Sequence, residues 1–145
     1  MTPDELSERL IDFAARVGKV VDALPDTRMG RHIVIAGQFV RCGTSPAPNY
    51  EEACAAESRA DFVHKLGICL KELRESRCWI RLIVRTELLP EHRMSELLDE
   101  CDQLCSIIGQ SIVSKGEPER QAIDAELQFA IFIFQFSIFN SRHRR

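Results

Sequence analysis

The chain has 145 residues and a net charge of −3, with 45% hydrophobic and 28% charged residues. This length fits one domain, large enough to need no disulfide or metal for its core. The composition argues against global disorder. The acidic net charge argues against a surface that is basic throughout, which most nucleic-acid-binding domains have. A basic face confined to one element stays open, because phosphate contacts depend on where the charge lies.

The first predicted helix runs from Asp4 to Leu24. Pro3 suits a first helical turn, Asp4 and Glu5 suit the positive end of the helix dipole, and Pro25 closes the segment. Apolar residues recur at steps of three and four, which places them on one face of the helix: Leu6, Leu10, Phe13, Val17, Val20 or Val21, and Leu24.

A second helix is predicted from about Met29. Its expected apolar face combines Ile33, Ala36, Phe39 and Val40, with Ile35 widening the coverage. The pattern breaks at Gly43, and two prolines then remove backbone donors at positions 46 and 48. We therefore expect a kinked helix, or a break followed by a helical turn over Asn49–Ala56.

The third predicted helix, Arg59–Glu87, is the longest, and Ser58 is its expected N-cap. The fourth runs from Glu91 to Ser114. The predicted core stripe of the third helix comprises Phe62, Leu66, Cys69, Leu73, Ile80 and Val84, and it is flanked by Leu70 and Ile83. The predicted core stripe of the fourth helix comprises Leu97, Cys101, Leu104, Ile108 and Ile112.

Four amphipathic helices with short links predict an all-α fold, an antiparallel up-down-up-down four-helix bundle over residues 1–116. Residues 117–145 form a separate tail, whose run 127–140 holds five of the chain's eight Phe and is followed by a basic end. This run is too short and too polar to predict an integral membrane span. Three interpretations stay open: packing on the bundle or a neighbouring subunit, contact with a membrane surface, and a poorly ordered extension.

The six cysteines include no CxxC pair, and the charged N-terminus lacks a signal peptide, so we expect a cytoplasmic chain with reduced thiols. Cys101 and Cys105 are four residues apart and can share a helix face. No His or further Cys lies close to them in sequence, which favours small buried hydrophobes over a metal site. No cofactor is predicted.

One block of the chain carries a family resemblance. Its features lie within residues 41–83: Arg41, Gly43, Thr44, Ser45, Asn49, Glu52, Ala53, Ser58 to Phe62, His64, Lys65, Leu70 to Glu72, Glu75 and Trp79. The block resembles the bacterial four-helix-bundle proteins related to those encoded in intervening sequences of large-subunit ribosomal RNA genes. The similarity covers roughly residues 6–115, and the chain departs from the family pattern at Cys42, Pro46, Pro48 and Cys69.

The resemblance implies a cytosolic bundle and, from characterised relatives, a ring-shaped homopentamer. One related branch contains the accessory variability determinant proteins of diversity-generating retroelements, which bind the reverse transcriptase and nucleic acid. Neither branch is known as an enzyme, and for most members no activity is established.

Arginines on the third helix are the candidate functional residues. At about 100° per residue, Arg74, Arg77, Arg81 and Arg85 form one narrow stripe. Arginine suits phosphate recognition because its planar fork contacts two oxygens. The stripe is bordered by Lys71, and the second helix can add Arg28, Arg31 and Arg41. The competing interpretation is a subunit interface, or a solvated face neutralised by Glu72, Glu75 and Glu87 through i,i+3 and i,i+4 pairs.

Polar residues near the broken helix allow a second interpretation, a carboxylate site. Such a site in a bundle needs Glu-x-x-His pairs, which the sequence lacks. We therefore expect Asn49, Glu52 and Glu72 to satisfy backbone groups or to meet basic side chains between helices. Trp79 lies off the main stripe, where it can take part in a subunit contact.

No nucleophile, triad or phosphate-cradling loop is recognisable, so the sequence predicts a protein that is not an enzyme. The favoured function is RNA or DNA binding by an oligomeric bundle through the arginine stripe. The alternative is a protein-interaction scaffold whose ring face or Phe-rich tail engages a protein partner.

Overall fold

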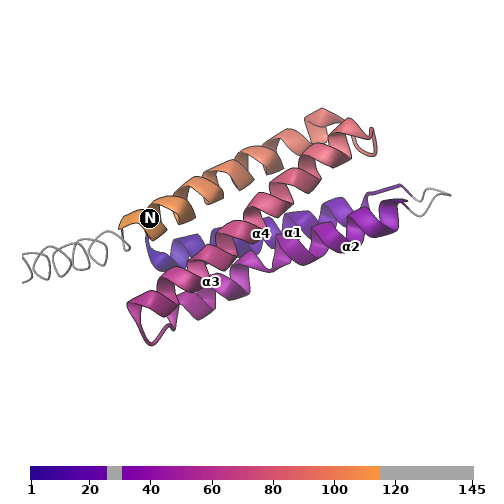
Figure 1. Cartoon of the computed structure of the whole chain (residues 1–145). Coiled ribbons are helices and arrows are strands. Elements are labelled where there is room, and N and C mark those ends of the chain that lie inside the picture. The colour runs from indigo at the N-terminus through magenta and orange to yellow at the C-terminus, as the bar shows by residue number, and fades with distance from the viewer. Residues whose placement is uncertain (26–30, 115–145) are drawn as a thin grey trace, which may run out of the picture. The chain divides into compact units, whose positions relative to one another are not determined.

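The computed structural model describes residues 1–25 and 31–114. The predicted tail, 117–145, lies outside these residues, as does the candidate Arg28. The described helices are α1 (Pro3–Asp22), α2 (Arg31–Thr44), α3 (Pro46–Cys54), α4 (Arg59–Arg85) and a last helix, 91–114 (Figure 1).

Helix α1 begins with a capping box. The hydroxyl of Thr2 accepts from the Glu5 backbone N–H at 3.2 Å, and the Glu5 carboxylate accepts from the Thr2 N–H at 2.7 Å. These two bonds satisfy donors that a helix start leaves unpaired. The predicted core face is confirmed over most of its length, because Leu6, Leu10, Phe13 and Val17 are buried.

The second predicted helix bends without breaking. Ser45 keeps a helical backbone, its N–H donates to the Arg41 carbonyl at 3.2 Å, and α3 starts at the next residue. The expected turn therefore begins at Pro46, three residues earlier than predicted. Proline is tolerated in a first helical turn, and the two prolines lack the N–H groups that would continue the α2 ladder, so the direction changes here.

The predicted core face of α2 was wrong in part. Ile35, Phe39 and Cys42 are buried, whereas Ile33 and Val40 are 65% and 37% exposed. The buried residues and the exposed residues both have helical spacing, so the sequence period alone does not show which of the two faces is buried. The packing of α2 against α1 and α4 selects the face that contains Phe39.

Helix α4 begins at the predicted cap, where the Ser58 hydroxyl accepts from the Asp61 N–H at 3.1 Å. It ends at Arg85, earlier than predicted. Glu87 lies in the left-handed region with φ of 57°, and the Leu88 N–H donates to the Ile83 carbonyl at 3.1 Å. This pattern is a Schellman ending, which turns the chain toward the last helix.

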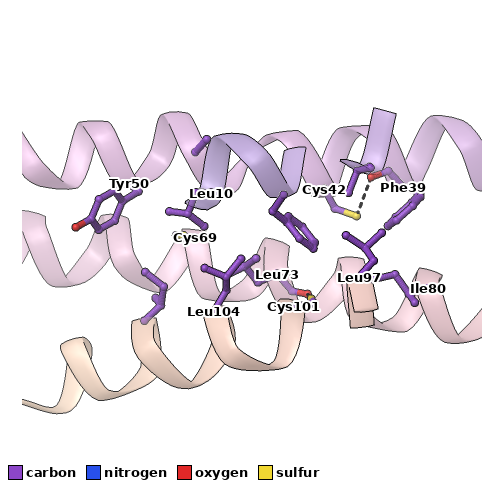
Figure 2. Packing of buried hydrophobic residues seen from close by; sticks show 14 of the residues in the cluster. Leu10, Phe39, Cys42, Tyr50, Cys69, Leu73, Ile80, Leu97, Cys101 and Leu104 are labelled. Atoms are coloured by element: carbon purple, nitrogen blue, oxygen red, sulfur yellow. Dashed lines mark hydrogen bonds between the residues drawn. The ribbon is translucent and has the colours of Figure 1, made fainter. Parts of the chain in front are cut away.

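The core lies between four antiparallel helical segments: α1, the bent α2–α3 pair, α4 and helix 91–114. Figure 2 shows the buried side chains in the central part of this core. The all-α four-helix fold with a bent second helix is thus confirmed. Within α4 the predicted stripe shifts slightly, because Ile83 and Ser76 are buried while Phe62 and Val84 are half-buried. None of the described helices is long and apolar enough to span a membrane.

Candidate nucleic-acid interface

The arginine stripe of α4 lines a surface groove of about 290 Å³. A helix rises about 1.5 Å per residue, so the stripe extends over about 16 Å of α4. The groove lies in the C-terminal half of α4, which rises toward the turn before the last helix in Figure 1. The four predicted arginines, Arg74, Arg77, Arg81 and Arg85, line it. Cys78 and Leu82, which the sequence analysis did not predict, complete the lining.

Three of the four arginines have no acidic partner in the part of the chain that the structure describes. Within the described residues, no carboxylate lies at ion-pair distance from Arg74, Arg81 or Arg85. These three guanidinium groups are exposed. Neutralisation of the whole stripe by carboxylates of α4 therefore does not occur, and the groove keeps positive charge that can bind an anion.

The fourth arginine connects α4 to the last helix. Arg77 Nη1 donates to Asp102 Oδ1 at 3.1 Å, and this hydrogen bond raises the pKa of the Arg77 guanidinium. Both side chains are partly exposed, and such a pair stabilises a fold by at most about 1 kcal/mol. Its main effect is to hold one guanidinium at the edge of the groove.

Arg41 lies on the other flank of α4 and does not add to the groove. Its Nη2 donates to Glu75 Oε1 at 2.7 Å and its Nη1 to Glu72 Oε2 at 3.4 Å. The bond to Glu75 raises the pKa of Arg41. Trp79 Nε1 also donates to Glu75, at 3.3 Å. Two of the three acids that were expected to compete for the stripe, Glu72 and Glu75, thus face away from it.

The structure gives positions for most of the remaining candidate residues. Lys71 is exposed on α4, and the side chain of Arg31 is outside the described part of the chain. Asn49 Nδ2 donates to the Ser45 carbonyl at 2.9 Å, inside the α2–α3 bend. Glu52 pairs with Lys65 across α3 and α4. These contacts are local and interhelical, and they hold the bend against α4.

The thiols differ sharply in exposure. Burial raises the pKa of Cys69 to about 12 and that of Cys42 to about 11. Cys101 is buried and its Sγ donates to the Leu73 carbonyl at 3.2 Å. The neighbouring Cys101 thiol lowers the pKa of Cys105. Among the described residues, no group of three His, Cys, Asp or Glu side chains can hold a metal ion.

A second groove adjoins the first. It has a volume of about 340 Å³ and lies between the end of α4 and the start of the last helix. Arg81 and Arg85 line both grooves. The sequence reading missed this groove, because three of its residues, Glu91, Ser95 and Asp99, face α4 only once the two helices pack together.

Comparisons with known proteins agree with this architecture. The profile of the 23S rRNA-intervening sequence protein family matches residues 5–110. The chain is also similar to a solved protein of unknown function from the S23 ribosomal protein family of Bacteroides thetaiotaomicron. The identity is 29%, the TM-score is 0.70, and the match covers 77% of this chain and 98% of the other. No curated protein sequence matches the chain.

Proposed function

The chain belongs to the 23S rRNA-intervening sequence protein family, and we propose that it binds nucleic acid through the arginine-lined groove of α4. The observation that carries the proposal is a shared groove with three exposed arginines that have no acidic partner among the described residues. Guanidinium groups bind phosphate oxygens through two parallel hydrogen bonds, and they remain charged at every physiological pH.

The acidic net charge is compatible with this function. The residues that line the groove are four arginines, Cys78 and Leu82, and Glu72 and Glu75 are directed to Arg41 on the opposite flank. Screening limits the reach of exposed charges to about 8 Å at physiological ionic strength. The charges nearest to a phosphate in the groove are therefore those of the arginines that line it.

Binding is tested by fluorescence anisotropy with labelled RNA and DNA at low and near-physiological salt. Counterion release makes affinity fall steeply with salt, and each phosphate-contacting cation contributes about one unit to the logarithmic slope. The double variant Arg81→Gln with Arg85→Gln should therefore bind more weakly at low salt, with a slope shallower by about two.

The matched control removes the same charge elsewhere. Lys19 on α1 and Arg59 at the start of α4 are exposed and lie outside the groove. The double variant Lys19→Gln with Arg59→Gln should keep both affinity and salt slope. Equal weakening by the two double variants would show a response to net charge alone, and no binding at low salt would reject the proposal.

A second candidate function, protein interaction, is favoured by one observation. The outer face of α2 exposes Ile33 and Val34 at 65% and 62%, together with Val40. Ile33 and Val40 are seven residues apart and share one side of α2, and exposed apolar residues that lie together often mark a protein contact. It supports the scaffold alternative and the predicted homo-oligomer, with a second copy of the chain as the simplest partner.

Light scattering after size-exclusion chromatography tests this candidate. If the α2 face joins copies, Ile33→Asp with Val34→Asp should lower the particle mass, because buried carboxylates are costly. Ile11→Asp is the control, since Ile11 is also an exposed apolar residue but belongs to α1. An unchanged mass in the α2 variant would exclude this face as the contact.

A further inference from the structure

The second groove has an apolar floor. Met94 is buried, and Val84 and Leu98 are half-buried beneath the opening. The volume of about 340 Å³ lies within the range of about 300–1,000 Å³ that holds small ligands. A flat ring can cover this floor, whereas the backbone of a duplex presents no apolar surface to it.

The rims of this groove carry opposite charges. Arg81 and Arg85 form one wall on α4, and Glu91 and Asp99 form the other on the last helix. Within the part of the chain that the structure describes, none of these four side chains forms an ion pair. Cationic donors and anionic acceptors therefore face the same apolar space and are free to bind a ligand.

We infer that this groove seats one unpaired nucleobase of a single-stranded nucleic acid whose phosphates lie on the arginines. The inference rests on the proposed phosphate-binding function of Arg81 and Arg85, which line both grooves. Unpaired bases are splayed out of RNA loops and read by stacking, on guanidinium planes among others, and by hydrogen bonds to their edges. Bases in a duplex are not available for such an insertion.

The acidic wall predicts which bases fit. A carboxylate only accepts hydrogen bonds, so it favours the exocyclic amino groups of cytosine, adenine and guanine. Uracil presents carbonyl oxygens at the corresponding position, and these repel a carboxylate. Asp99 and Glu91 should therefore select amino-bearing bases over uracil.

The test compares affinities for labelled single strands of about 12 nucleotides. The probes are oligo(C), oligo(A) and oligo(U) RNA, oligo(dC) DNA and an RNA duplex. We expect oligo(C) and oligo(A) to bind about tenfold more tightly than oligo(U) and the duplex. Similar affinities for oligo(C) and oligo(dC) would define a site for single strands in general, and a preference for oligo(C) would define an RNA site.

Two variants test whether the second groove is where the base binds. Asp99→Asn keeps the size of the side chain but adds a donor, so the preference for oligo(C) over oligo(U) should fall to about twofold or less. Ser95→Leu fills the groove and should lower the affinity for oligo(C) toward that for the duplex. Ser106→Leu is the matched control, an exposed serine on the same helix three turns farther along. Circular dichroism and thermal unfolding establish that each variant is folded.

The outcomes separate the two proposals. If all single strands and the duplex bind equally while the double variant Arg81→Gln with Arg85→Gln weakens every complex, the base seat is rejected and the phosphate groove stands. Unchanged binding by Ser95→Leu also rejects the seat. If the arginine variant binds every probe as well as the unaltered protein, both proposals fail.

Discussion

The side chain of Val17 on α1 rests on the backbone of Gly43 on α2. A Cβ atom at position 43 would lie 2.6 Å from Val17 Cγ1 and 2.7 Å from Cγ2, far inside a normal contact. Val17 is fully buried and β-branched, so it has little freedom to rotate away. The close approach of the two helices at this point therefore requires glycine.

We expect Gly43→Ala to destabilise the protein by about 1–3 kcal/mol, the usual cost of overpacking a core. Denaturant unfolding followed by Trp79 fluorescence measures the change. Val17→Ala should make Gly43→Ala less costly, because it removes the atoms that clash. Gly67→Ala is the control, since nothing lies within 4 Å of its added methyl group. Equal effects at positions 43 and 67 would contradict the contact.

The ending of α4 makes a second substitution favourable. Glu87 has φ of 57°, a conformation that costs a residue with a Cβ roughly 1–2 kcal/mol. Glu87→Gly removes this strain and should stabilise the protein by about 1 kcal/mol in thermal or denaturant unfolding. Glu87→Ala keeps a Cβ and should bring no comparable gain. A loss of stability in Glu87→Gly would argue against the Schellman ending.

Buried thiols should make the fold sensitive to alkali. Burial raises the pKa of Cys69 from 9.0 to about 12, so the native state retains a proton that the unfolded chain releases. Stability is therefore unaffected by this thiol below pH 9 and falls as pH rises from about 9 to about 12.

The slope attributable to one such thiol is at most about 1.4 kcal/mol per pH unit. Unfolding free energies measured across this pH range should thus decline less steeply in Cys69→Ala than in the unaltered protein. Cys78→Ala, which removes an exposed thiol, is the comparison. The burial of Cys69 would be in question if both variants lost stability with the same slope.

Cys78 offers a direct footprint of the arginine groove. Its thiol is exposed and lines the groove, whereas Cys54 is exposed on α3 and lies outside it. Bound nucleic acid should slow maleimide labelling of Cys78 several-fold and leave Cys54 unaffected, as followed by peptide mass spectrometry. Equal protection of both thiols would indicate nonspecific coating, and protection of neither would place the ligand elsewhere.

Much of this architecture is readable from the sequence. Helical spacing alone predicted the core face of α1 and the alignment of Arg74, Arg77, Arg81 and Arg85, because residues three and four apart lie on one side of a helix whatever surrounds it. Ser58 was readable as a cap for the same reason, since capping depends on neighbours a few residues away.

Other features depend on contacts between residues far apart in the chain. The exposure of Ile33, the pairing of Arg41 with Glu75, the pairing of Arg77 with Asp102 and the groove beside Asp99 all follow from how each helix is rotated against its neighbours. A sequence period fixes which residues share a face, but it leaves that rotation open. Packing of the whole core sets the rotation of each helix. The rotation then decides which charged side chains meet across helices and which remain unpaired.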